Sequence, residues 1–521
     1  MAKQQTDGKN GSKEDGGKKT KLAAQIAPNL DEVRARLGNS PELITREYEL
    51  LYTPVKVAII YMDGITDKAL VEDYINHAMS FEELPSGTVP LEKADSVFEY
   101  MKVIAHNIGK EKVVKDVEGL IEALISGDTV ILIEGIREAV SASTAGGEVR
   151  AVTEATTQVA IRGSKESFTE TISTNIALVR RIIKSADLWT ETFKVGNVTR
   201  TDVTIMYMHG IASDDTVAHL RKELKGIDVD SILESGYIEQ IIEENKFSPF
   251  PTIYNTERPD SVAGNLLDGR IAIFVDGTPV VLIAPTTFFM FFHSVEDYYQ
   301  RFDISTLIRL LRFLCLMISL FGPAVFVAAL NFHQEMIPTP LLISLAAQRE
   351  GVPFPTFIEA LMMEVTFEII REAGIRMPSP IGQTVSIIGG LVLGQAAVQA
   401  GIISPAMVIV VSLTGISSFA TPAFNMALTI RMLRFVLMIT AAFIGIYGIA
   451  VFCLILIAHL CSLRSLGVPF MSPIAPLVTA DQKDTFIRWP LHFMTSRPRL
   501  VNNNNQISVK GKLPGKKKNG N

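Results

Sequence analysis

The sequence predicts a soluble α/β N-terminal region made of two related lobes, followed by an all-α transmembrane domain with about four spans. Two observations support this prediction. Short apolar strands alternate with amphipathic helical patterns over roughly the first 300 residues, which is typical of α/β organisation. The mean hydropathy of the chain is +0.27 although 20% of its residues are charged. The apolar residues must therefore be concentrated in one region, and they lie in the second half.

The first half repeats one pattern of strand, helix and strand. The strand VKVAIIYMDG ends at Gly64 and precedes the amphipathic stretch ITDKALVEDYINHA, and DVTIMYMHG ends at Gly210 and precedes IASDDTVAHLRKEL. A further strand closes each unit, DTVILIEG at Gly135 and RIAIFVDG at Gly277. Gly135 follows Gly64 by 71 residues, and Gly277 follows Gly210 by 67. We therefore predict two related lobes, with a left-handed turn at each of these glycines.

The segment ESFTETISTNIALVRRIIKS between the lobes predicts a helix with two distinct faces. Its apolar face consists of Phe168, Ile172, Ile176, Val179 and Ile183. Its basic face consists of Arg180, Arg181 and Lys184. The predicted domains are a disordered tail (1–27), a first lobe (28–163), the linking helix with a second lobe (164–301), a transmembrane helical domain (302–499) and a disordered basic tail (500–521).

The membrane prediction depends on uncharged runs. No Asp, Glu, Lys or Arg occurs from Met377 to Ile430, a run of 54 residues. Such a run can hold two spans of about 20 residues each, and uncharged stretches flank it on both sides. We predict four spans, over Phe313–Leu330, Val385–Ile403, Pro405–Ala423 and Phe435–Leu460.

The basic residues beside these runs predict the orientation. Arg301, Arg309 and Arg312 precede the first span and Arg464 follows the last, so both ends are expected in the cytoplasm. The N-terminal residues contain no apolar stretch typical of a cleaved signal peptide, which agrees with a cytoplasmic soluble region. Arg431 and Arg434 fit less well, because this topology requires them to face outward or to be buried.

The composition argues against several function classes. The net charge of −6, with acidic residues spread through the first half, argues against a nucleic-acid binder. None of the eight histidines pairs with another at a spacing of three or four residues, and no catalytic motif is present. The three cysteines lie in or beside apolar runs. We therefore expect no enzymatic activity, no cofactor, no metal site and no disulfide.

The predicted second span, VSIIGGLVLGQAAVQAGII, carries the first candidate site. Gly390 and Gly394 are four residues apart, which allows close helix packing. Gln395 and Gln399 share a face, and amides in hydrocarbon need partners or water. Together with Val398 these residues are predicted to line a pore or to pack helices. A hydrogen bond between helices of a structural bundle is the alternative.

The segment PTFIEALMMEVTFEIIREAG carries the second candidate site. We predict that Glu364 and Glu368 form a pore vestibule that attracts cations. The alternative is an interfacial helix with a solvated charged face. The apolar face consists of Phe357, Leu361, Met362, Val365 and Ile369, and the charged face of Glu364, Glu368, Arg371 and Glu372.

Several long motifs resemble the A-subunit family of GerA-type spore germinant receptors. They are FIEALMMEVTFEIIREAGIRMPSPIGQTVSIIGGLVLGQAAVQAGIISPAMVIVVSLTGISSF, SFTETISTNIALVRRIIKSADL and GRIAIFVDGTPVVLIAPTTFFMFF. The resemblance extends from about Leu43 to Arg499 and leaves only the tails unmatched.

The resemblance implies an integral protein of the inner spore membrane, whose partners are membrane lipid, a transporter-like B subunit and a lipoprotein C subunit. Nutrients are expected to bind chiefly the B subunit. The A subunits are expected to form a homo-oligomeric ring around a pore for monovalent cations, and its opening starts germination. A paralogue from the dipicolinate-channel operon shares the pattern and is expected to amplify the ion-release signal. The sequence does not distinguish the two.

A ligand-gated cation channel subunit is thus the leading functional prediction. A second hypothesis is a small-molecule-binding sensor module, in which the lobes capture the ligand and the helices are an anchor. A third is a secondary transporter, which is less favoured because no inverted repeat is visible.

Overall fold

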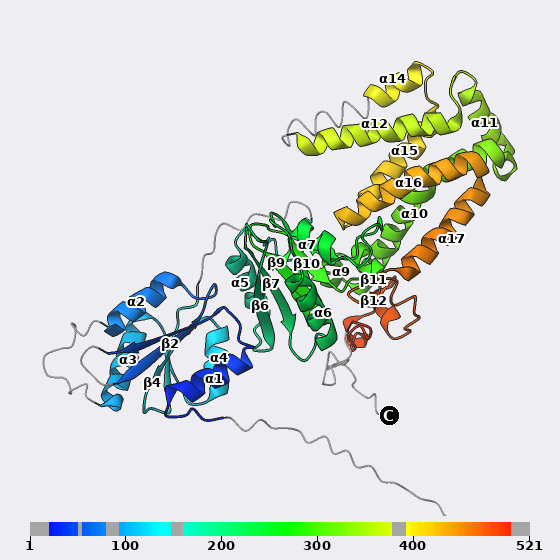
Figure 1. The fold of residues 1–521 in the computed structure, drawn as a ribbon. Coiled ribbons are helices and arrows are strands. Elements are labelled where there is room, and N and C mark those ends of the chain that lie inside the picture. The colour runs from blue at the N-terminus through cyan, green and yellow to red at the C-terminus, as the bar shows by residue number, and fades with distance from the viewer. Residues whose placement is uncertain are drawn as a thin grey trace, which may run out of the picture. The chain divides into compact units, whose positions relative to one another are not determined.

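Two five-stranded sheets with the same strand order form the first part of the chain (Figure 1). The first consists of β1 (Leu43–Glu49), β2 (Lys56–Met62), β3 (Glu111–Val114), β4 (Thr129–Ile133) and β5 (Ala139–Ala142). The second consists of β6 (Leu188–Val195), β7 (Thr201–Met208), β8 (Tyr254–Thr256), β9 (Ile271–Val275) and β10 (Val281–Ala284). Their orders are β1-β2-β4-β5-β3 and β6-β7-β9-β10-β8. In both, the third strand along the chain lies at the far edge, so the predicted repeat of two related α/β lobes is confirmed.

The computed structural model describes residues 20–50, 55–79, 93–146, 158, 160–377 and 392–501. Contacts divide the chain into two units. The first comprises Met1–Ala151 and Ser173–Glu191, and the second comprises Val152–Ile172 and Thr192–Asn521. The first sheet lies in the first unit, and the second unit contains the second sheet, apart from the start of β6, and all later helices. The domain boundaries predicted from the sequence stay predictions.

The central strands pair in the antiparallel sense in both lobes. Val57 of β2 lies opposite Ile133 of β4, and Val203 of β7 lies opposite Val275 of β9. β4 and β9 are buried along their whole length. The predicted left-handed turns are confirmed by positive φ angles at Gly64 (85°), Gly135 (94°), Gly210 (73°) and Gly277 (89°).

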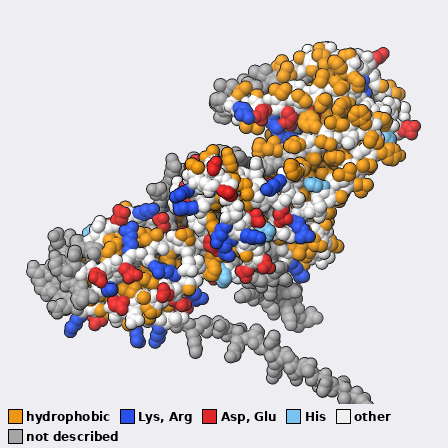
Figure 2. All heavy atoms as spheres, in the orientation of Figure 1, with side chains coloured by type: hydrophobic (Ala, Val, Ile, Leu, Met, Phe, Trp, Pro, Cys, Tyr) orange, Lys and Arg blue, Asp and Glu red, His pale blue; other side chains and the backbone are white. Residues whose placement is uncertain are grey.

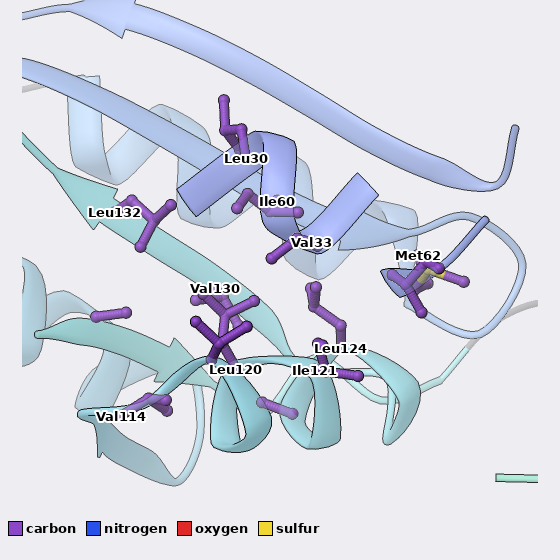
Figure 3. Packing of buried hydrophobic residues seen from close by; sticks show 14 of the residues in the cluster. Leu30, Val33, Ile60, Met62, Val114, Leu120, Ile121, Leu124, Val130 and Leu132 are labelled. Atoms are coloured by element: carbon purple, nitrogen blue, oxygen red, sulfur yellow. The ribbon is translucent and has the colours of Figure 1, made fainter. Parts of the chain in front are cut away.

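The core of the first lobe shows how alternation along a strand builds two apolar layers. Figure 3 shows one layer, in which α1 (Ile26–Arg36) and α4 (Val117–Ile125) cover Ile60 of β2 and Leu132 of β4. Ile59, the neighbour of Ile60, points into the other layer, which is covered by α2 (Lys68–Met79) and α3 (Ala94–Ile108). Helix α2 and its counterpart α6 (Asp214–Lys225) are the two amphipathic helices predicted from the sequence, and both are confirmed.

The linking helix α5 (Ile172–Ile182) forms, but it begins after Phe168, and one residue of its predicted basic face is placed differently. Arg180 is buried, and its Nη2 lies 3.0 Å from Oε1 of Glu42, which also accepts the Thr190 hydroxyl at 2.6 Å. A buried guanidinium requires such a partner. The expectation that Arg180 lies on a face opposite the buried one is therefore wrong, because Glu42 compensates its charge inside the first unit.

The second unit continues from its sheet into a helical region. Helices α7 (Ser235–Ile242) and α8 (Pro259–Leu267) belong to the second lobe, and the 3-10 helix η2 (Phe288–Phe292) and α9 (Glu296–Tyr299) follow its last strand. The helical region consists of α10 (Phe302–Phe332), η3 (Gln334–Met336), α11 (Thr339–Arg349), α12 (Thr356–Arg376), α14 (Gly394–Gln399), α15 (Pro405–Ser418), α16 (Phe424–Ile444) and α17 (Ile446–Ser462). A C-terminal segment then forms β11 (Arg464–Ser465), β12 (Val468–Pro469) and the 3-10 helices η5 (Asp481–Asp484) and η6 (Leu491–Phe493).

Four membrane spans are not confirmed. Within the described ranges, two helices are long and apolar enough to cross a membrane, α10 and α16, whereas α15 and α17 are apolar but shorter. Helix α10 is about 47 Å long at 1.5 Å per residue, against a hydrocarbon core of about 30 Å. The predicted span Val385–Ile403 lies partly outside the described residues.

The single span predicted over Phe435–Leu460 is wrong, because the chain turns between α16 and α17 at Gly445, where φ is 69°. Figure 1 shows the two helices meeting at that end. The sequence did not reveal this turn, because Gly445 lies within a long apolar run. Glycine also occurs inside membrane helices, so its presence there did not indicate a break.

We expect Gly445→Ala to destabilise the helical region. The backbone angles there (φ 69°, ψ −145°) suit glycine alone and cost another residue about 1–3 kcal/mol. An added Cβ would also lie 2.9 Å from His333 and 3.0 Å from Phe332. Gly467→Ala is the matched control, because its φ is 82° but nothing lies within 4 Å of the added Cβ. The melting temperature of the detergent-purified protein should fall more for Gly445→Ala; equal shifts would contradict the predicted clash.

Candidate functional site

Helix α12 buries two of its glutamates and exposes two of its apolar residues. Glu359 and Glu364 are fully buried, whereas Val365 and Ile369 are 43% and 64% exposed. Soluble amphipathic helices have the reverse arrangement. Of the predicted charged face, Glu364 is buried and Glu372 is exposed, with a side chain that is 57% accessible. Buried charge with exposed apolar residues on one helix suits a lipid environment, and the vestibule and interfacial-helix interpretations both stay predictions.

The buried pair of Glu364 and Arg434 joins three helices. Nη1 of Arg434 in α16 lies 2.7 Å from Oε2 of Glu364 in α12. The same guanidinium donates to Ser319 of α10, from Nε to the carbonyl at 2.6 Å and from Nη2 to the hydroxyl at 2.9 Å. The predicted topology required Arg431 and Arg434 to face outward or to be buried, and both are buried. Removing either charge would leave the other buried without its partner.

Two further glutamates of α12 bind neighbouring helices. Glu359 accepts a hydrogen bond of 2.5 Å from the backbone N–H of Ser404 and a second from its hydroxyl, at the N-terminus of α15. Glu368 pairs with Arg371 on its own helix and lies 3.9 Å from Nη1 of Arg431 in α16. The three carboxylates thus attach α12 to α15 and α16.

Four of the five residues predicted to line a pore lie in α14, and Gly390 precedes this helix in the sequence. Gly390 lies outside the described residues. Gly394 is buried, and a Cβ there would lie 3.8 Å from Val408, an ordinary contact. Gln395 and Gln399 are exposed and Val398 is partly exposed. Among the described residues, no hydrogen bond or ion pair connects these amides to Glu364 or Glu368. The pore and vestibule roles of both sets stay predictions.

A second buried charge network lies at the start of α10, and the sequence reasoning missed it. Oδ2 of Asp297 lies 3.1 Å from Nε of Arg309 and 3.0 Å from Nη1 of Arg312. Arg309 also contacts Oδ1 of Asp484 at 2.7 Å. Burial alone would raise the pKa of Asp297, but the hydrogen bond from Arg312 and the charges of both arginines lower it below the ordinary value. The network fixes α10 to α9 and to the C-terminal segment.

The C-terminal segment packs on the second lobe. The Ser465 hydroxyl donates to the Thr252 carbonyl at 2.6 Å and accepts from the Thr286 N–H at 2.9 Å. The ring of Phe470 lies 6.1 Å from those of Phe288 and Phe291. The chain thus enters the helical region from the second lobe and returns to the same lobe.

A third set of contacts attaches α16 and α17 to the second lobe. Thr429 of α16 donates to the Pro249 carbonyl at 2.5 Å, and the Ser248 hydroxyl lies 3.0 Å from Nε2 of His459 in α17. Asn425 approaches Glu239 at 3.4 Å. Burial, with help from the neighbouring Glu243 and Glu234, raises the pKa of Glu239 to about 7.

The charged side chains at these sites form ion pairs and hydrogen bonds with one another. Across the described part of the chain, no group of three or more His, Cys, Asp or Glu side chains is placed to hold a metal ion. Both networks instead hold helices in fixed positions through buried charges. The arrangement defines a class of protein in which two α/β lobes are joined to an apolar helical region that buries ion pairs between its helices.

The chain belongs to the Bacillus/Clostridium GerA spore germination protein family, whose family model matches residues 31–500. It is similar to spore germination protein KA of Bacillus subtilis (strain 168), with 48% identity over 93% of this chain and 88% of that protein. It is also 43% identical to the uncharacterized membrane protein YfkQ of the same organism, over 93% of each chain.

Among solved structures, the chain is similar to the N-terminal domain of the A subunit of the Bacillus megaterium spore germinant receptor GerK3. The identity is 42%, and the match covers 52% of this chain and 99% of that one with a TM-score of 0.42.

Proposed function

We propose that this chain is the A subunit of a nutrient-responsive spore germination receptor and that copies of it assemble into a cation channel. Membership of the GerA family supports the role in germination. The observation that carries the channel proposal is an apolar helical region with an exposed pair of amides, Gln395 and Gln399, on one short helix. Neither the receptor role nor the channel requires enzymatic chemistry, a cofactor or a nucleic acid.

The helical region has the surface expected of a protein in a lipid bilayer. Figure 2 shows hydrophobic side chains over most of its visible face, whereas charged side chains are spread over the lobes. Glu364 of α12 and Arg434 of α16 lie inside and form an ion pair. Because both ends of the helical region contact the second lobe, we place that lobe and the C-terminal tail together on the cytoplasmic side of the inner spore membrane.

The exposed amides support assembly around water. An amide facing hydrocarbon is costly unless it finds a partner or water. Gln395 and Gln399 are four residues apart on α14, so they lie on one face. Repetition of this face around a ring of copies would place the amides on a wet channel, with Val398 beside them. The proposed partners are further copies, a transporter-like B subunit, a lipoprotein C subunit and monovalent cations.

We expect Gln395→Ala to change ion flux. The purified protein is reconstituted in potassium-loaded vesicles, and potassium release is measured. Loss of an amide from the channel wall should alter the potassium flux severalfold. Val398→Ala should also alter the flux, because a smaller side chain changes the width of the channel. Gln348→Ala is the matched control, because Gln348 is an exposed glutamine of α11 in the same helical region. Wild-type flux from both test variants, or no flux from any protein, would refute the channel proposal.

A second candidate is a small-molecule sensor anchored by the helices. It is favoured by a cavity of about 370 Å³ between the second lobe and the C-terminal segment.

A further inference from the structure

The cavity lies where three parts of the second unit meet. Tyr254 and Leu267 come from the second lobe, Phe289 and Tyr298 from the segment before α10, and Asp484 and Leu500 from the C-terminal segment. Its volume of about 370 Å³ is in the range of pockets that hold small organic molecules. Apolar and aromatic side chains form much of the wall, so an occupant would have an apolar body.

Most charged groups of the wall already have partners. Asp260 receives two hydrogen bonds from Arg258, at 3.0 and 2.7 Å. Asp484 is held by Arg309 at 2.7 Å and by the Tyr298 hydroxyl at 2.6 Å. His293 lies with Nε2 2.9 Å from the Thr485 carbonyl, and burial, with the charge of Arg309, lowers its pKa to about 4. That imidazole is therefore neutral near pH 7, and these groups do not need a ligand.

One arginine of the wall has a buried hydrogen-bond donor without a partner, and two arginines next to the wall do as well. Arg270 lines the cavity and is 8% exposed, and its Nη1 donates to Asn265 at 2.5 Å. Its buried Nε has no acceptor within the described residues. Within the described residues, Nη2 of Arg309 and Nε of Arg488 are also buried and also lack an acceptor. Both of these arginines lie over the ring of Tyr298, at 5.4 and 5.6 Å, and Tyr298 lines the cavity.

A buried guanidinium N–H without an acceptor is costly, so Nε of Arg270 leaves a place for an acceptor at the cavity wall. A carboxylate is the organic group whose two oxygens match the fork of an arginine. The remaining wall carboxylate near Arg270 is Asp268, at 3.7 Å from Nη1, which leaves the Nε position unfilled. A carboxylate oxygen would therefore fit at Nε of Arg270, and the apolar residues of the wall would fit an apolar body.

We infer that this cavity binds a small organic carboxylate, with its oxygens toward Nε of Arg270 and its apolar body against Phe289 and Leu500. Tyr298 and Asp484 line the same cavity, and both contact Arg309 of α10. The inference deepens the sensor proposal and does not depend on ion conduction, so the flux and binding experiments can fail separately.

The test is calorimetric titration of the full chain in detergent with butyrate and benzoate, and with butylamine, butanol and inorganic phosphate for comparison. We expect heat from the two carboxylates alone. Arg270→Met should weaken their binding about tenfold or more, because it removes a charged donor. Arg137→Met, at an exposed arginine of the first unit, should change nothing.

Gly264→Phe gives a test that leaves Arg270 intact. Gly264 lines the cavity, and a Cβ added there meets nothing within 4 Å, so a large side chain can enter the space without a backbone clash. We expect this variant to keep the wild-type melting temperature and to lose carboxylate binding. The inference is overturned if neither carboxylate binds, if amine, alcohol or phosphate binds as well as they do, or if the folded Gly264→Phe variant binds as wild type does.

Discussion

Asp297→Asn is expected to destabilise the second unit by about 3–5 kcal/mol, because it removes the carboxylate that two buried arginines share. Arg309 and Arg312 both bond Asp297, and Arg309 keeps only Asp484 afterwards. The melting temperature of the full chain in detergent measures the effect. Asp303→Asn is the matched control, because Asp303 pairs with Arg301 on the surface, where the side chains are 50% and 77% exposed. Such exposed pairs contribute little.

The effect of Asp297→Asn should also depend on pH. The pKa of Asp297 is lowered in the folded protein, so its stabilisation is fully present above the unfolded value of about 3.9 and is lost as pH falls through the folded value. The difference in melting temperature between wild type and Asp297→Asn should therefore be constant near neutrality and shrink below about pH 4. A difference that persists at lower pH, or equal losses from Asp297→Asn and Asp303→Asn at pH 7, would contradict the proposed role of the network.

Arg434→Met is expected to destabilise the helical region by about 3–5 kcal/mol, because Glu364 would remain buried without its partner. Glu364→Gln should have a comparable effect, since Arg434 would then keep only its bonds to Ser319. The double variant should lose less than the sum of the two, by about 1–3 kcal/mol. The melting temperatures of wild type, the two single variants and the double variant, all measured in detergent, give a double-mutant cycle.

A second pair on the same helix provides the control for this cycle. Arg376 and Glu372 lie 2.7 Å apart, as Arg434 and Glu364 do, but their side chains are 78% and 57% exposed. The substitutions Arg376→Met and Glu372→Gln should change the melting temperature little, and their effects should be additive in the double variant. Additive effects for Arg434 and Glu364 would show that their contact carries no coupling, contrary to the expectation.

The sequence was sufficient to predict the lobes, because each strand ends in a glycine that the turn requires. Gly64 and Gly210 mark equivalent positions, and the strand patterns around them survive in both copies. Strand order was not predictable in this way, since the edge strands β3 and β8 contain only four and three residues. Their places are fixed by pairing partners far along the chain.

The sites were less predictable, because their partners are distant in sequence. Arg180 is on the basic side of a helical pattern, and only Glu42, 138 residues away, explains its burial. The pattern of α12 defined two faces but not which one points inward. That choice depends on Arg434, 70 residues beyond Glu364. Gly445 lies in an apolar run that looks like one span, and the turn there is visible only from its backbone angles.

The return of the C-terminal segment to the second lobe has a consequence for biosynthesis. Ser465 contacts Thr286 and Phe470 contacts Phe288, yet Ser465 follows Thr286 by 179 residues in the chain. A ribosome releases the lobe strands long before it makes these residues, so that wall of the lobe waits for translation to finish. Folding of the helical region must then bring the end of α17 back to the lobe from which α10 starts. Truncation after α17 would leave the aromatic cluster around Phe288 uncovered, a surface that chaperones bind and proteases cut.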